Sequence, residues 1–134
     1  MGVREFSFSS AVAVCGMFVS SWLGGWDVAL KLLVVLMVFD YVTGLLGAIK
    51  NRAVNSEVMF WGGVRKGIIA TVIAIAVLLD QMVGNASPIL RTLAIYFYIA
   101  REAISITENL GILGLPLPPK IAEVLTQLQK SGDK

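Results

Sequence analysis

The stretch VALKLLVVLMVFDYVTGLLGAI, residues 28–49, decides the fold class of this chain. Its length of about 22 residues corresponds to roughly 33 Å of helix, enough to cross the hydrocarbon core of a bilayer. The stretch therefore predicts a membrane-spanning helix. Asp40 lies near its middle, where a charged side chain costs about 2.5–3.5 kcal/mol on insertion scales, so it needs a polar partner or water.

Three further apolar stretches occupy residues 7–23, 67–84 and 89–110. The first is short and contains five serines. Its leader MGVRE pairs one basic with one acidic residue and no cleavage site follows, so we expect a membrane span or an interfacial helix, the span being favoured, rather than a signal peptide. The last is interrupted by Arg101, Glu102 and Glu108. We expect one domain, residues 1–134, with an all-α fold. It would be an integral membrane protein with three or four transmembrane helices and a short amphipathic C-terminal helix.

That C-terminal helix is expected at residues 119–130, because two prolines precede an apolar face with helical spacing. About eleven residues form a marginal helix in isolation, so this helix must pack on something. The sequence leaves open whether that is the membrane surface, a neighbouring subunit or its own bundle.

Composition excludes several classes of protein. Of 134 residues, 57% are hydrophobic and 15% charged, and the net charge of +2 is too small for a nucleic-acid partner. The chain has no histidine and one cysteine, which leaves too few residues for a disulfide or a Cys/His metal site. We therefore expect no enzyme, no catalytic residue, no cofactor and no metal.

The distribution of charge predicts the topology. Residues 50–66 carry Lys50, Arg52, Arg65 and Lys66 against one glutamate, so the positive-inside rule makes this segment a cytoplasmic loop. The C-terminus, with three lysines including Lys134, and the N-terminus with Arg4 fall on the same side. The residues expected at the membrane interfaces are Trp22, Trp26, Asp80 and Arg91 on the outer side and Trp61 on the inner side.

Polar side chains at membrane depth are the candidate functional residues. Asp40 and Arg101 each lie 12 residues from the outer end of their stretch, roughly 18 Å deep, so they are expected to pair within or between chains. Tyr98, Arg101, Ser105 and Glu108 form one helical stripe, which Glu102 and Asn109 widen. A helix with such a stripe is expected to lie in the membrane interface, to pack the stripe against other protein, or to line a water-filled opening.

Two faces of small residues suggest close helix packing and an oligomer. One face, in the stretch 28–49, is formed by Thr43, Gly44 and Gly47. The other, in the stretch 67–84, is formed by Gly67, Ala70 and Ala74.

Four segments resemble the toxin-secretion/phage-lysis holin family. They are GGWD at 24–27, LMVFDYVTGLLGAI at 36–49, LRTLAIYFYIAREAISITENLGILGLPLP at 90–118 and VLTQL at 124–128. The family has two motifs, D-Y-x-T-G and E-x-x-S-I-x-E-N-x-x-x-x-G-x-P-x-P. The residues that match the first are Asp40, Tyr41, Thr43 and Gly44, and those that match the second are Glu102, Ser105, Glu108, Asn109, Gly114, Pro116 and Pro118. Arg101 departs from the family pattern, in which a small polar residue stands.

The resemblance implies a bacteriophage or prophage protein that forms homo-oligomers in the bacterial cytoplasmic membrane of the host. Such proteins open lesions through which an endolysin reaches the cell wall or, in some relatives, a toxin is released. The holin does not need to bind the protein that passes through. Two other readings remain open: a small ion channel or transporter that uses Asp40 and Glu108, and a structural subunit of a membrane complex.

Overall fold

The computed structural model describes the backbone of residues 3–132 and the side chains of residues 7–128, 130 and 131. In this range the fold is all-α, with five helices: α1 (Val3–Trp22), α2 (Val28–Lys50), α3 (Ser56–Val83), α4 (Ile89–Leu113) and α5 (Pro119–Gly132). The expectations for the side chains of Arg4 and Lys134, and for the two residues at each end of the range 1–134, lie outside the described residues.

Side-chain caps and glycines set the helix ends. Asp27 accepts a hydrogen bond from the backbone N–H of Leu30 at 2.9 Å and starts α2. Asn55 starts α3 in the same way, accepting from the N–H groups of residues 57 and 58. Gly84 and Gly114 end α3 and α4 in the left-handed conformation, with φ of 75° and 78°.

Helix α3 is longer than the apolar stretch at 67–84 predicts, and this corrects the expected loop at 50–66. The helix begins at Ser56, so the connection from α2 to α3 is only residues 51–55. Arg65 and Lys66 therefore lie on a helix rather than in a loop. The apolar run underestimates the helix because Asn55 caps it one turn after α2 ends, well before the uniformly apolar part begins.

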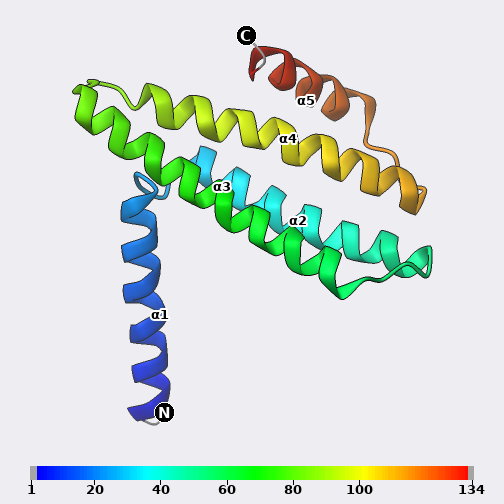
Figure 1. Cartoon of the computed structure of the whole chain (residues 1–134), viewed down its shortest axis with the longest axis horizontal. Helices are drawn as coiled ribbons and strands as arrows, with labels where there is room; N and C mark the ends of the chain where they lie inside the picture. Colours follow the sequence, from blue (N-terminus) through cyan, green and yellow to red (C-terminus); the bar gives the residue numbers. More distant parts are fainter. Residues whose placement is uncertain (1–2, 133–134) are drawn as a thin grey trace.

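Helices α2, α3 and α4 lie side by side and α4 makes the most extensive contacts, with α2 above all (Figure 1). Their apolar core is formed by the side chains of Leu30, Leu33, Ile69, Ile73, Ile95 and Ile99. Among the described residues, α2 and α3 are the two helices long and apolar enough to cross a membrane. The first helix contains a shorter apolar stretch, Ser7–Trp22.

The two terminal helices differ in how they join this bundle. Helix α5 turns back and packs along α4, on the side away from α2 and α3 (Figure 1), which answers the question the sequence left open about its packing. Helix α1 projects away from the other helices, and its described side chains up to Val19 are exposed apart from that of half-buried Ser10.

Candidate functional site: an ion cluster between α2, α3 and α4

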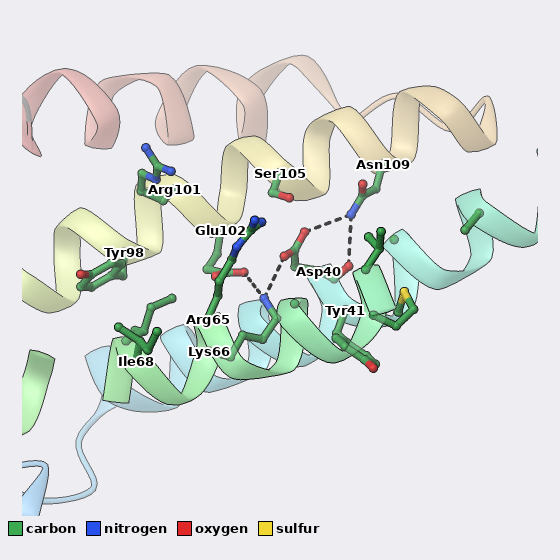
Figure 2. A pocket seen from close by; sticks show the side chains of 16 residues that line it. Asp40, Tyr41, Arg65, Lys66, Ile68, Tyr98, Arg101, Glu102, Ser105 and Asn109 are labelled. Carbon is green, nitrogen blue, oxygen red and sulfur yellow. Dashed lines mark hydrogen bonds and ion pairs between the residues drawn. The ribbon is translucent and has the colours of Figure 1, made fainter. Parts of the chain in front are cut away.

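The Lys66 ammonium joins three helices. It donates to Asp40 Oδ2 on α2 at 2.8 Å and to Glu102 Oε2 on α4 at 2.8 Å (Figure 2). The three side chains are mostly enclosed, with relative exposures of 17% for Lys66, 16% for Asp40 and 8% for Glu102. We call Asp40, Lys66 and Glu102 the ion cluster.

Helical spacing brings these residues to the same place. Lys66 precedes the buried Ile69 and Ile73 by three and seven residues, so it extends the buried face of α3. Asp40 follows the buried Leu33 by seven residues, and Glu102 lies on the buried face of α4. The ion cluster therefore continues the apolar core along the bundle.

A hydrogen-bonded amide extends the ion cluster along α2. The Asn109 side-chain amide donates to Asp40 Oδ1 at 3.0 Å, to the Asp40 backbone oxygen at 3.1 Å and to Thr43 Oγ1 at 3.0 Å. Thr43 in turn donates to the Phe39 backbone oxygen at 2.8 Å. One face of α2 is thus tied to α4 by polar contacts whose partners all lie within the chain.

Charge counting shows what holds the ion cluster together. Two carboxylates face one ammonium, so removal of the cation would leave two acids close together in a medium of low dielectric. Hydrogen bonds from Asn109 satisfy part of Asp40. Among the described residues, no buried side-chain nitrogen or oxygen lacks a partner.

The predicted partner of Asp40 was Arg101, and this is not the ion pair in the structure. Arg101 is exposed, as is Glu108, while Ser105 is half-buried. Arg101 and Glu102 are consecutive on α4, so their side chains point about 100° apart, and Glu102 is the one that reaches Lys66. Equal depth along the two helices does not bring Asp40 and Arg101 together, because the rotation of α4 about its axis presents Glu102 to Lys66 instead.

Beside the ion cluster an open groove of about 510 Å³ lies between α2, α3 and α4. Figure 2 shows Tyr98, Arg101 and Ser105 along its α4 side and Arg65 along its α3 side. Part of the predicted polar stripe therefore does border a common space, while the exposed Glu108 is not among the residues that line it.

A second polar cluster, which we call the Arg91 clamp, joins α4 to the connection between α1 and α2. The Arg91 guanidinium donates to Asp27 Oδ2 at 2.7 Å, to the Leu23 oxygen at 2.6 Å and to the Gly25 oxygen at 3.0 Å. Its side chain is 5% exposed, against 52% for Asp27. The guanidinium of Arg91 holds the pKa of the Asp27 carboxyl below its usual value.

Asp80, which was expected to flank Arg91 at the outer interface, contacts the backbone of Arg91. Its carboxylate accepts from the N–H groups of Leu90 and Arg91 at 3.0 and 2.9 Å and from the Asn85 amide at 2.8 Å. Asp80 therefore caps α4 from α3, and both Asp80 and Arg91 are buried.

Of the small residues predicted to pack between helices, those on α2 contact α4, whereas those on α3 are only half-buried or face open space. Thr43 and Gly47 are buried against α4, and a Cβ on Gly44 would lie 3.6 Å from the Asn109 amide nitrogen. Ala70 and Ala74 are half-buried, whereas a Cβ on Gly67 would meet open space. The tryptophans expected at the interfaces, Trp22, Trp26 and Trp61, are about half exposed, at 49%, 52% and 52%.

Sequence reasoning missed the role of two residues. The sequence pattern predicts Lys66 in a loop, although its spacing to Ile69 and Ile73 indicates a position on the core-facing side of a helix. Asp27 belongs to the GGWD segment but was given no role. In the described part of the chain no group of three or more His, Cys, Asp or Glu residues is arranged to hold a metal ion.

Comparison with known proteins gives a consistent result. A family model described as the bacteriophage holin family matches residues 17–130. An uncharacterized 14.9 kDa protein of Clostridium perfringens is 40% identical over 109 residues, covering 81% of this chain and 83% of the relative. An uncharacterized protein of Halalkalibacterium halodurans is 36% identical, covering 92% and 95%. A probable holin of Bacillus phage phi105 is 32% identical over 105 residues, covering 78% and 77%. No solved structure matches.

Proposed function

This chain belongs to the bacteriophage holin family, and from that premise we propose that it oligomerises in the bacterial cytoplasmic membrane and opens lesions that release an endolysin or a toxin. The released protein needs no direct contact with the chain. The direct partners are other copies of the same chain and the lipid bilayer. In this role the chain is a membrane protein without catalytic activity.

The observation that carries the proposal is the position of the ion cluster. Asp40 and Lys66 lie on the two helices with membrane-spanning length and composition, yet their charges are satisfied inside one chain together with Glu102. In this state the charges of the ion cluster are shielded from lipid while the chain is dilute. When copies assemble, the polar groups held between apolar helices become available to water. The membrane would therefore stay intact until assembly and become permeable afterwards.

The membrane topology forms part of the same proposal. Helices α2 and α3 cross the membrane, and α4 crosses with them because it packs along both. The apolar stretch Ser7–Trp22 of α1 is shorter than α2 and α3 and projects away from them (Figure 1), so the proposal counts three crossings. The basic residues around the 51–55 connection, and the end of α4, lie on the cytoplasmic side by the positive-inside rule.

Inducible expression in a bacterium, with and without a cell-wall hydrolase that lacks a signal peptide, tests the proposal. We expect abrupt lysis only when both proteins are present, because the hydrolase reaches the cell wall only through a hole wide enough for a folded enzyme. Loss of membrane potential without hydrolase release would replace the proposal by an ion channel or transporter. An unchanged membrane potential and no lysis would favour a structural subunit.

A further inference from the structure

The groove beside the ion cluster has a charged part and an apolar part. Its charged lining consists of the ion cluster, Arg65 on α3 and Arg101 on α4 (Figure 2). The small and apolar lining on α2 and α3 includes Gly44, Ala48, Val58, Met59, Gly62 and Ile68. At about 510 Å³ the groove is in the size range of pockets that hold small organic ligands.

Arg65 and Arg101 differ from the other charged residues of this lining. Both side chains are exposed, and among the described residues the structure shows no ion pair for either. Lys66, the neighbour of Arg65 along the chain, is instead held by both carboxylates of the ion cluster. A guanidinium at an apolar groove within a membrane requires an anion or water beside it, so the two arginines are the groups that a ligand would meet.

The charges around the groove indicate the sign of that ligand. The ion cluster contributes two negative charges and one positive charge, and the two arginines add two positive charges, which leaves the lining with a net charge of +1. A ligand with a single negative charge makes the groove neutral. A phosphodiester carries one negative charge, and its oxygens match the fork of a guanidinium.

Arg65 lies at the level expected for phospholipid phosphates. It precedes the end of α3 at Val83 by roughly 27 Å of helix, and the hydrocarbon core of a bilayer is about 30 Å thick. Phe60 and Trp61, about one turn before Arg65, are exposed, as aromatic side chains at the headgroup level commonly are. In the topology proposed above, Arg65 therefore reaches the phosphates of the cytoplasmic leaflet, and Arg101 lies deeper, roughly 18 Å from the outer end of α4.

From Arg65 toward the outer side, α3 continues with an exposed apolar face. Three exposed apolar side chains follow at the spacing of one side of a helix: Ile68, Ile75 and Leu79. Because Ile68 also lines the groove, this face starts in the groove and runs for roughly 16 Å toward the middle of the membrane. A cationic group followed by an apolar track is the surface that a phosphate followed by an acyl chain requires.

We propose that the groove between α2, α3 and α4 binds one anionic phospholipid, with its phosphodiester on Arg65 and an acyl chain along the exposed apolar face of α3. Arg101 adds its positive charge from the deeper side of the groove. A zwitterionic phospholipid brings a cation of its own and leaves the net charge at +1, so the groove selects the anionic class. The inference rests on the membrane topology of the proposed function and adds a lipid ligand to it.

The test measures lipid binding by the purified full chain in detergent micelles, with native mass spectrometry to count bound lipids. Dioleoyl phosphatidylglycerol is the anionic probe, and dioleoyl phosphatidylcholine is the zwitterionic probe with the same acyl chains. We expect one phosphatidylglycerol to bind per chain, about tenfold more tightly than phosphatidylcholine. Equal affinity for the two lipids would overturn the inference.

A third probe separates a lipid from a free phosphate. Glycerophosphoglycerol has the headgroup and phosphodiester of phosphatidylglycerol but no acyl chain. We expect it to leave the bound lipid in place when both are present at the same concentration. Displacement of the lipid by this compound would show that the groove recognises a soluble phosphodiester, and the lipid assignment would be lost.

Substitution of the arginines tests which charges bind the lipid. Arg65→Gln should weaken phosphatidylglycerol binding about tenfold, because it removes the bidentate contact, and Arg101→Gln about threefold, through loss of a more distant charge. Arg52→Gln is the control, since Arg52 is basic and exposed near the same end of the bundle but is not among the residues that line the groove. Equal weakening by all three substitutions would reveal unspecific attraction to surface charge and overturn the inference.

A steric variant tests the place of the lipid without changing any charge. Gly62 lines the groove, whereas Gly63 does not, and a Cβ on Gly63 would meet open space. Gly62→Leu should weaken phosphatidylglycerol binding about tenfold by filling the groove, and Gly63→Leu should leave it unchanged. Circular dichroism verifies that both variants are helical. Unchanged binding in folded Gly62→Leu would place the lipid elsewhere and overturn the inference.

Lipid binding and hydrolase release are separate measurements, one on the purified chain and one in cells. Failure of the wild-type chain to prefer phosphatidylglycerol therefore overturns the lipid site, whatever the lysis experiment gives. The lysis experiment alone decides the proposed function.

Discussion

Gly24 lies directly against the guanidinium of Arg91: a Cβ at Gly24 would stand 2.5 Å from Arg91 Nε and 2.6 Å from Arg91 Cδ. Arg91 is on α4 and is 4% exposed, so it cannot move outward without leaving its three acceptors in the Arg91 clamp. Gly24 also has a φ of +84°, which a residue with a side chain rarely adopts. The connection between α1 and α2 is thus fixed by the absence of a side chain.

Gly24→Ala should therefore destabilise the protein by roughly 1–3 kcal/mol, from the left-handed backbone and the collision with Arg91 together. Gly25→Ala is the matched control, because Gly25 has a φ of +103° but open space around its Cβ position. Thermal unfolding in detergent, followed by circular dichroism, measures both. Equal losses for the two variants would show that the contact with Arg91 contributes nothing.

Replacement of Lys66 tests the ion cluster. Lys66→Met leaves Asp40 and Glu102 as unpaired carboxylates in a mostly enclosed site, and we expect a loss of about 3–5 kcal/mol. Arg65→Met changes the same charge on the same helix at an exposed position and should cost less than about 0.5 kcal/mol. Thermal unfolding is again the measurement.

The triple variant Lys66→Met, Asp40→Asn, Glu102→Gln separates charge from packing. Because it removes both carboxylate charges along with the cation, it should recover most of the stability lost in Lys66→Met. If the triple variant is as unstable as the single one, the loss comes from packing of the lysine stem and not from the ion cluster.

Sequence reasoning succeeded where the apolar run and the helix coincide. Helices α2 and α4 begin at residues 28 and 89, the positions at which their apolar stretches begin. It failed at α3, because the part of that helix before Gly67 mixes polar and apolar residues and resembles a loop in composition. That failure also concealed Lys66 as the partner of Asp40.

The candidate site shows the same division. The half-buried Asp40 and the buried Glu102 could be identified from the sequence, since charge in an apolar segment is conspicuous. Their partners depend on which way each helix is turned and which helices meet, and those facts arise from tertiary packing. Depth alone selected Arg101, whereas the rotation of α4 presents Glu102 to the bundle and leaves Arg101 exposed.

Asn109 offers a separate test of how α4 is held against α2. Asn109→Leu removes the donor that reaches Asp40 and Thr43, and leaves polar atoms at the α2–α4 contact without a partner. We expect a loss of about 1–3 kcal/mol in the free energy of unfolding. Glu108→Gln, at the exposed neighbouring position, is the control and should leave stability unchanged within about 0.5 kcal/mol.

The pH dependence of stability should report on the Arg91 clamp. Arg91 lowers the pKa of Asp27 in the folded protein, whereas the unfolded chain has the usual aspartate value of about 3.9. Below that value the unfolded state binds the proton first, so the Asp27 contribution is complete above pH about 4 and is lost as the pH falls through the lowered folded pKa. The free energy of unfolding of Asp27→Asn should therefore fall less steeply with acid than that of the wild-type protein in this range, while the two curves run parallel from pH 5 to 7.

Glu57→Gln is the control, because Glu57 is exposed and the structure shows no ion pair for it among the described residues. Identical acid dependence for wild type and Asp27→Asn would mean that the 2.7 Å contact between Arg91 and Asp27 does not stabilise the folded state.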